Sequence, residues 1–237
     1  MDDLQENLFA LLREKGAKLI GVADMEGYTE NGLNRGVAVA IPVPAHIVEE
    51  IKTNPTIEYY QMYHTLNAQL DEMVEAGAAF LQKYGFRARA NTKKNLSVND
   101  DLRTPYPYKT VATKAGLGWI GKSCLLVTEE YGSAVRLSSL LTDAPLEPAI
   151  PITESRCGNC RRCVDACPGQ AIIGTAWTAG MPREDIIHAH VCKETQITRM
   201  REFLGFYEGE RVCGRCFAVC TYTQKYLRRT LSSKAHS

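Results

Sequence analysis

The sequence CGNCRRCVDACP at residues 157–168, together with CGRCFAVC at residues 213–220, decides how the chain is organised. The first run has the spacing C-x2-C-x2-C-x3-C-P, which is typical of proteins that bind cubane iron–sulfur clusters. Three thiolates two residues apart can converge on one cluster from a single tight turn. The fourth cysteine, which precedes Pro168, points away and serves a second cluster. The spacing therefore predicts two four-iron clusters.

Eight of the nine cysteines divide into two sets of four ligands. A plain two-cluster ferredoxin would carry a cysteine at the position of Glu210, and Cys192 supplies that ligand from across an insertion. A disulfide framework or structural zinc fits less well, because nothing marks the chain as secreted and zinc sites use separated CxxC pairs. We therefore predict cluster one on Cys157, Cys160, Cys163 and Cys220, and cluster two on Cys167, Cys192, Cys213 and Cys216. The remaining Cys124 is expected to pack as a small buried hydrophobe.

Composition excludes some classes of partner. The 237 residues carry a formal net charge of +1, which gives no general attraction to nucleic acid or to anionic membranes. The N-terminal MDDLQEN lacks the basic-then-apolar order of a signal peptide, and no apolar run approaches the ~20 residues that span a bilayer. With reduced cysteines as well, these features predict a cytoplasmic protein without membrane contact.

Apolar spacing outlines the rest of the chain. A polar, proline-containing segment at residues 91–107 predicts a long loop, and loops of that length are usually functional or disordered. Prolines 145, 148 and 151 indicate a linker, so we expect an α/β domain over residues 1–148 and a helical cluster domain over residues 149–237. The predicted elements are strands at 18–23, 36–43, 86–90, 124–128 and 134–141, and helices at 54–85, 108–115, 195–206 and 217–231.

The segment GLGWIGKS at residues 116–123 matches both G-x-G-x-x-G and G-x-x-x-x-G-K-[ST]. Both nucleotide-binding motifs need a strand before the glycines and a helix after them. The predicted order here is the reverse, so we do not expect a nucleotide at this segment. The glycines either form a tight helix-to-strand connection or let a flat cofactor lie against bare backbone, and composition leaves both readings open.

The order of motifs resembles the epoxyqueuosine reductases, which are cobalamin-dependent relatives of the reductive dehalogenases. The resemblance rests on KAGLGWIGK at 114–122, LLTDAPL at 140–146, Tyr63 and His64 on the long helix, and the split cluster motif. It covers about residue 57 to residue 225. It implies an α+β protein, in which a nitroreductase-like or cobalamin-processing-like α/β domain precedes a helical, ferredoxin-like domain with two [4Fe-4S] clusters.

The resemblance also implies a base-off cobalamin that receives single electrons from the clusters. His64 could equally be a core histidine held by a hydrogen bond. Carried over by position, the corrinoid contacts would be His64, Gly116, Gly118, Trp119, Gly121, Lys122 and Ser123.

The chain departs from the family at the proton donor. The family acid lies in an Asp-Ser-Ala-Pro stretch, and the corresponding position here is Leu102. The candidates that remain are the neighbouring Asp101 and, in the proline-rich loop, Tyr106 and Tyr108. Packing against the prolines explains the two tyrosines equally well.

Three further departures concern the second half of the chain. CPGQAI at 167–172 stands where the family has Cys-Pro-Thr-Gly-Ala-Ile, and Thr221 replaces a proline after the last cysteine. The helical extension that queuosine enzymes use on tRNA is absent before Ser237, so a tRNA substrate is doubtful. The cations at the end of the chain are expected to form a solvated face, and they are Lys225, Arg228, Arg229 and Lys234.

Two functions from different classes fit the sequence. One is a reductase whose clusters feed a base-off corrinoid that reduces a small electrophilic substrate. The other is an electron-transfer protein that reduces a partner's cofactor, such as that of a corrinoid protein, without substrate chemistry of its own. Either needs a low-potential electron donor such as a flavodoxin or ferredoxin. The loss of the family acid favours the electron-transfer protein, and the retained glycine segment favours the reductase. We expect a reductase.

Overall fold

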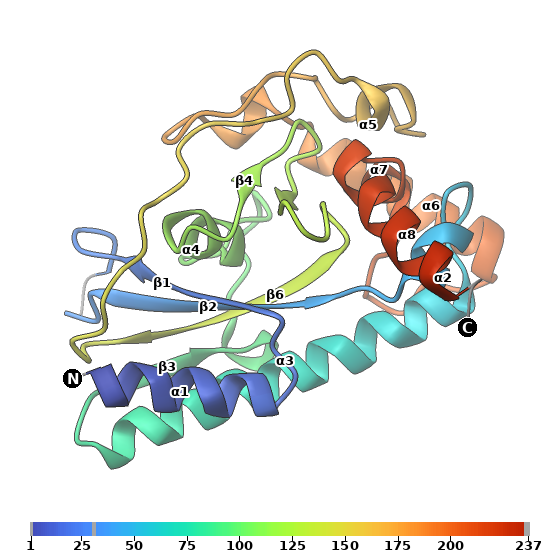
Figure 1. Ribbon diagram of the computed structural model, residues 1–237. Helices are drawn as coiled ribbons and strands as arrows, with labels where there is room; N and C mark the ends of the chain where they lie inside the picture. Colours follow the sequence, from blue (N-terminus) through green and yellow to red (C-terminus); the bar gives the residue numbers. More distant parts are fainter. Residues whose placement is uncertain (1, 30–31, 235–237) are drawn as a thin grey trace. The chain divides into compact units, whose positions relative to one another are not determined.

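The computed structural model describes residues 2–29 and 32–234 (Figure 1). Helices and strands are mixed, as the α+β prediction required, and the residues form two compact units that are each discontinuous in sequence. Unit 1 comprises Met1–Pro42, Thr65–Gly118 and Arg136–Thr153, and unit 2 comprises Val43–His64, Trp119–Val135 and Glu154–Ser237. The predicted boundary at residue 148 concerns contiguous domains, and it stays a prediction.

Unit 1 is built on a four-stranded sheet with the strand order β1-β2-β6-β3. The pairs β1–β2 and β3–β6 are antiparallel, with Leu19 opposite Ala40 and Ala88 opposite Thr142. Pro42 ends β2, because proline has no N–H to continue a ladder. The strands are β1 (Leu19–Asp24), β2 (Arg35–Pro42), β3 (Ala88–Asn91) and β6 (Val135–Thr142).

Helices cover both faces of this sheet (Figure 1). On one face, a Cβ added at Gly77 of α3 would lie 2.8 Å from Leu140 of β6 and 3.2 Å from Leu12 of α1, so glycine permits the close approach. On the other face, α4 packs against β1 and β2, and a Cβ at Gly21 would lie 2.3 Å from the carbonyl oxygen of Ala115. The helices are α1 (Asp2–Glu14), α3 (Ile57–Lys83), the short 3-10 helix η1 (Lys93–Asn95) and α4 (Tyr108–Lys114).

Unit 2 is mainly helical, as predicted for the cluster-binding part. Helix α2 packs against α8, where the Tyr226 hydroxyl donates a hydrogen bond of 3.0 Å to the Val43 carbonyl. The Tyr59 ring lies edge-on to Phe217, with centroids 5.9 Å apart. The elements are α2 (Ala45–Glu50), β4 (Trp119–Ile120), β5 (Leu126–Val127), α5 (Arg162–Asp165), η2 (Arg183–Asp185), α6 (Ala189–Leu204), α7 (Arg215–Ala218) and α8 (Thr221–Lys234).

The glycine-rich segment has the predicted order of elements. Helix α4 precedes the glycines, the short strand β4 lies between Gly118 and Gly121, and β5, which pairs with β4, follows them. No helix begins at residues 116–123, so the backbone N–H groups of a helix N-terminus are not presented there. The long loop before α4 is also found, and it contains η1 and a tight turn closed by the hydrogen bond from Asn99 N–H to the Arg103 carbonyl.

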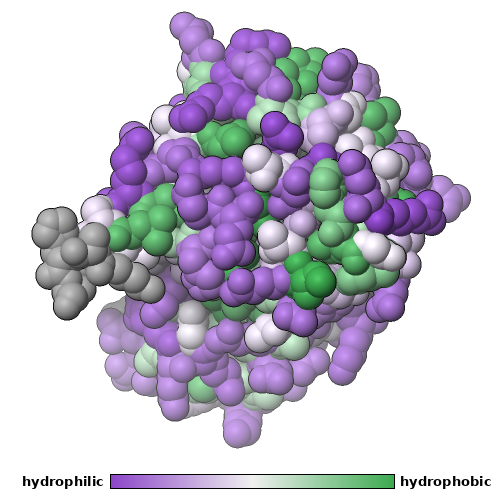
Figure 2. Space-filling model, turned by 90° about the vertical axis from the view of Figure 1, so that its right-hand side faces the viewer, coloured by the Kyte–Doolittle hydropathy of each residue, from purple (hydrophilic) through white to green (hydrophobic). Residues whose placement is uncertain are grey.

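Figure 2 shows a face on which hydrophilic side chains predominate and hydrophobic side chains form small separate patches. Among residues 2–29 and 32–234, no helix is both long enough and apolar enough to cross a membrane.

Candidate metal centre

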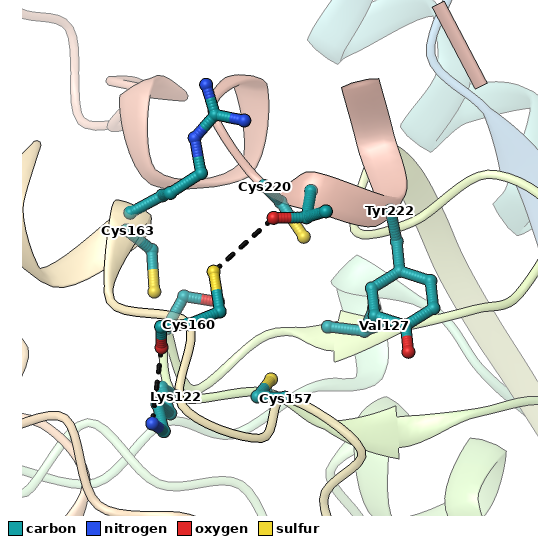
Figure 3. A pocket seen from close by; sticks show the side chains of 11 residues that line it. Lys122, Val127, Cys157, Cys160, Cys163, Cys220 and Tyr222 are labelled. Carbon is teal, nitrogen blue, oxygen red and sulfur yellow. Dashed lines mark hydrogen bonds between the residues drawn. The ribbon is translucent and has the colours of Figure 1, made fainter. Parts of the chain in front are cut away.

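Four cysteine side chains line one cavity in unit 2, and Figure 3 shows their sulfur atoms around it. Cys157 and Cys160 belong to the turn before α5, Cys163 lies in α5, and Cys220 lies between α7 and α8. The structure thus brings together the cysteines predicted for cluster one, and we call them the first thiol group. The other residues of the lining are Gly121, Lys122, Ser123, Val127, Arg162, Thr221 and Tyr222.

Local backbone geometry shapes the turn that carries the first three of these thiols. Cys160 N–H donates to the Cys157 carbonyl at 3.2 Å, and Gly158 takes the left-handed φ of +52°, which a side chain would disfavour. The Lys122 ammonium binds the main chain of this turn. It donates to the carbonyl oxygens of Gly158 at 2.8 Å and Cys160 at 3.2 Å.

The other four predicted ligands form a second thiol group, made of Cys167, Cys192, Cys213 and Cys216. Burial raises the pKa of Cys216 well above its usual value, and the nearby Cys213 and Cys192 raise it further. Burial also raises the pKa of Cys192; a hydrogen bond from Gln196 opposes this, and Cys167 and Cys213 add to it. Cys163 of the first thiol group also adds to the rise in the pKa of Cys216, so these influences are not confined to the second group.

In the first thiol group, too, burial and neighbouring thiols raise the pKa of a cysteine. Burial and the neighbouring Cys220, Cys157 and Cys160 raise the pKa of Cys163 to about 12. Buried thiols that repel one another as thiolates ionise at neutral pH when bound cations compensate their charge. Among the described residues no three or more His, Cys, Asp or Glu side chains are arranged to hold a single metal ion. The first thiol group instead surrounds a cavity, and its all-sulfur donor set fits an iron–sulfur cluster.

Cys160 differs from its neighbours. Burial would raise its pKa, but the Thr221 hydroxyl, 3.3 Å from the sulfur, and the charges of Arg162 and Lys122 lower it. Thr221 is the residue that replaces the family's proline. A hydroxyl can donate a hydrogen bond to sulfur where proline has no such donor, so this departure changes the surroundings of the first thiol group.

Packing beside the second thiol group explains why CPGQAI has glycine at residue 169, where the family has threonine. A Cβ added at Gly169 would lie 1.9 Å from Oγ1 of Thr195, a residue of α6. The following Gln170 takes φ +50°, a left-handed conformation that glycine adopts more easily. Ala171 N–H then donates to the Cys167 sulfur at 3.3 Å, while the Gln196 amide donates to the Cys192 sulfur at 3.2 Å.

Cys124 is buried, with 5% of its surface exposed, as expected for a small hydrophobe. Its φ of +60° is unusual for a non-glycine residue. It also lies close enough to Cys192 to raise the pKa of that thiol. No spacing rule signalled this proximity, because Cys124 is outside both cysteine runs.

The residues predicted to contact a corrinoid have varied surroundings. Gly116 and Gly118 belong to unit 1, whereas the Trp119 ring is fully buried in unit 2, edge-on to Tyr222 at 4.9 Å. His64 is exposed and edge-on to Tyr60, so it is not a core histidine. The three that line the cavity of the first thiol group are Gly121, Lys122 and Ser123. The corrinoid role of the whole set stays a prediction.

The three candidate proton donors also differ. Asp101 is exposed in the turn before Leu102, which has φ +60°. Tyr108 is half-buried at the start of α4. Tyr106 lines a cavity of about 370 Å³ in unit 1, and the Arg89 guanidinium carbon lies 5.5 Å from the centre of its ring. The rest of that lining is Asn91, Asn95, Leu96, Ser97 and Pro105.

Comparison with known proteins agrees with this arrangement. Residues 156–223 match the family model described as a 4Fe-4S double cluster binding domain. An epoxyqueuosine reductase from Listeria monocytogenes is 35% identical over 120 residues, which are 48% of this chain and 29% of that protein. The enzyme of the same name from Lactococcus garvieae is 30% identical over 168 residues, which are 68% of this chain and 42% of that protein. The chain therefore spans less than half the length of these relatives.

Solved structures support the fold. An epoxyqueuosine reductase with an epoxyqueuosine-modified tRNA stem loop has a TM-score of 0.59 and 22% identity, over 94% of this chain and 66% of that one. A reductive dehalogenase, whose structure is described as suggesting a mechanism for B12-dependent dehalogenation, has a TM-score of 0.71 and 17% identity, over 98% of this chain and 34% of that one. The chain is thus a relative of the epoxyqueuosine reductases that carries a 4Fe-4S double cluster binding domain.

Proposed function

We propose that the chain is an iron–sulfur reductase that uses cobalamin to reduce a small electrophilic substrate. The observation that carries the proposal is the cavity in unit 2 lined by four of the predicted ligands, Cys157, Cys160, Cys163 and Cys220, and the match of residues 156–223 to a 4Fe-4S double cluster binding domain supports it. When bound, the clusters would supply one-electron transfer at low potential, and cobalamin would supply a reducible cobalt. A low-potential flavodoxin or ferredoxin is the proposed electron donor.

The protein's own residues have defined tasks in this proposal. The first thiol group would hold cluster one and the second thiol group cluster two. Cys163 and Cys216 are only partly exposed to solvent, and hydrogen bonds from Thr221 and Gln196 orient two of the other sulfurs. Donors to sulfur and exclusion of solvent are the means by which proteins set cluster potentials.

Cobalamin enters the proposal through the relatives, one of which is a B12-dependent dehalogenase by description. The proposed contacts remain His64 and the glycine-rich segment. No step is assigned to individual residues of this set, since Trp119, Gly121, Lys122 and Ser123 are enclosed within unit 2.

The cavity in unit 1 is the proposed place for a small substrate. Its volume of about 370 Å³ lies within the range of small-molecule sites, ~300–1,000 Å³. The half-buried Tyr106 has a phenol that can donate a proton, and the adjacent Arg89 can attract an anionic or electron-rich substrate group. We therefore favour Tyr106 over the exposed Asp101 as the proton donor.

The test starts with protein purified without oxygen and reconstituted with iron and sulfide. Hydroxocobalamin is then added, and the visible spectrum is recorded before and after reduction by dithionite-treated flavodoxin. Binding of one base-off cobalamin per chain, with cobalt reduced only in protein that holds its clusters, is the expected result.

A matched pair of variants sharpens this test. Cys216→Ser removes a predicted cluster ligand, and Cys124→Ser changes a cysteine outside both sets. The first is expected to abolish reduction of bound cobalamin and the second to preserve it. Intact clusters without any cobalamin binding would contradict the reductase and would support the electron-transfer protein instead.

A further inference from the structure

Lys122 is a buried lysine beside the first thiol group. Only 8% of its surface is exposed, and it lines the cavity with Cys157, Cys160 and Cys163. Figure 3 shows the lysine next to the turn that carries these cysteines. Both hydrogen bonds from Nζ go to main-chain oxygens of that turn, at Gly158 and Cys160. A neutral donor of the same length could make such bonds, so they leave the charge itself unexplained.

An ammonium removed from water needs compensation by negative charge. In the described part of the chain no ion pair joins Lys122 to an aspartate or glutamate. The anions nearest to it in this cavity are the four thiolates that cluster binding requires. Each thiolate brings one negative charge, and reduction of a bound cluster adds another. The cluster and the lysine would therefore compensate each other.

The second thiol group has polar neighbours of another kind. Its sulfurs accept hydrogen bonds from the main-chain N–H of Ala171 and from the Gln196 amide, and both donors are neutral. Arg215 adjoins Cys216 in sequence and is half-buried with its Nε enclosed, so the second thiol group also has a cation beside it. In the first thiol group Cys160 accepts hydrogen bonds from the Thr221 hydroxyl and from the main chain at Arg162. The cavity of this group is in addition lined by the buried Lys122 and by the exposed Arg162.

We propose that Lys122 is a positioning residue for cluster one, whose buried positive charge stabilises the reduced cluster and raises its reduction potential. This inference rests on the proposed assignment of the two cysteine sets, and it goes beyond that assignment by giving a residue outside both sets control of one cluster's potential.

The experiment is a redox titration of the reconstituted protein, followed by electron paramagnetic resonance at fixed pH and salt. The variants are Lys122→Gln, which keeps a donor and loses the charge, and Lys122→Arg, which keeps the charge. Lys225→Gln is the matched control, because Lys225 is an exposed lysine of unit 2 that lies 4.9 Å from the ring centre of Tyr222, a residue of the same cavity. Solvent screens an exposed charge far more than a buried one.

Lys122→Gln is expected to lower the reduction equilibrium constant of one cluster by roughly tenfold, a shift of ~59 mV for a one-electron couple, and to leave the other unchanged. Lys122→Arg and Lys225→Gln should titrate like the wild type. If Lys122→Gln loses about half of the iron while Lys122→Arg keeps it all, the charge is needed to hold cluster one, which also supports the proposal.

Three results would overturn it: full iron with unchanged potentials in Lys122→Gln, an equal shift of both clusters, or an equal loss of iron in the glutamine and arginine variants. The last would mean that only the shape of lysine matters. Wild-type protein without cluster signals would overturn the proposed function itself, which keeps the two failures distinguishable.

Discussion

Asp143 joins the end of β6 to the residue before β3. Its carboxylate accepts hydrogen bonds from the Arg87 main-chain N–H at 2.8 Å and from Arg87 Nε at 2.7 Å. Burial would raise the pKa of Asp143, but the hydrogen bonds and the charge of Arg87 lower it below its usual range. No local pattern in the sequence indicates this contact, because the partner Arg87 is distant in the chain.

We expect Asp143→Asn to weaken this edge of the sheet at pH 7 by about 0.2–1 kcal/mol, the range for exposed ion pairs. A carboxylate whose pKa is lowered by folding stabilises the fold above its unfolded pKa, and this contribution is lost as the pH falls through the folded pKa. The difference between wild type and variant should therefore shrink in acid. Hydrogen exchange of β3 and β6 amides from pH 7 to pH 3 measures it, with the exposed Glu147→Gln as control. A difference that stays constant to pH 3 would refute the ion-pair explanation.

At this scale, the grouping of the four cysteines that line one cavity could be predicted from the sequence, because the distances between residues in one turn follow from covalent spacing. The assignment of ligands to the two clusters, with Cys192 included by counting, stays a prediction. The contacts of Lys122 and Thr221 with the first thiol group could not be predicted, because they depend on how residues 122 and 221 fold against the turn at residues 157–163.

Among the elements, helix α6 carries Cys192 and is positioned by a close contact. Thr195, one turn further along, lies where any side chain at Gly169 would be. The Thr195 hydroxyl is held in place by a hydrogen bond of 2.8 Å to the Val191 carbonyl. The chain from Cys167 to Gln170 can therefore approach α6 only with glycine at residue 169.

Gly169→Ala should push α6 away and cost about 1–3 kcal/mol, the usual penalty for overpacking. Because Cys192 moves with the helix, the iron held by cluster two should fall while cluster one is retained. The double variant Gly169→Ala with Thr195→Ala should recover iron, and Thr195→Ala alone should keep it. Iron content and the cluster absorbance report both effects. Normal iron in Gly169→Ala would show that the contact does not position the ligand.

Most regular elements of unit 1 were predictable, since their apolar periodicity is strong. The predicted start of α6 at residue 195 is wrong: the helix begins at Ala189. Residues 189–192 are AHVC, which give no amphipathic pattern, and His188 caps the helix without a side-chain hydrogen bond. The short helix α2 was missed because it is only a turn and a half long and follows two prolines.

For the molecule as a whole, the two units differ in what holds them together. Unit 1 has a four-stranded sheet with helices on both faces. In unit 2 the predicted ligands other than Cys192 of α6 lie in loops or in the short helices α5 and α7, which have four residues each. Helices of that length are not stable alone, so bound metal should contribute to the folding of these segments.

Removal of iron with a chelator under anaerobic conditions should therefore affect the two units unequally. We expect the amides of residues 157–167 and 213–220 to lose protection from hydrogen exchange, while those of β1, β2 and β6 keep theirs. Mass spectrometry of peptic fragments before and after chelation measures this. Uniform loss of protection would show instead that the whole chain folds around the metal, and unchanged protection would show that iron has no structural role.

The division into units could not be read from the sequence. Composition and prolines suggest a single boundary, whereas the segments 43–64 and 119–135 join unit 2 through contacts with distant residues. One such contact is the Ser133 N–H bond to the Thr223 hydroxyl at 3.0 Å, and another is the aromatic pair of Tyr59 and Phe217. Local patterns carry no information about partners so far along the chain.

The most direct test of the two-cluster assignment is to measure iron and acid-labile sulfide per chain. The measurement is made on anaerobically purified wild type, Cys192→Ser and Cys124→Ser. Two four-iron clusters predict about eight iron atoms in the wild type, about half as many in Cys192→Ser, and a wild-type value in Cys124→Ser. Zinc in place of iron, or equal iron loss in both variants, would contradict the assignment of the two thiol groups.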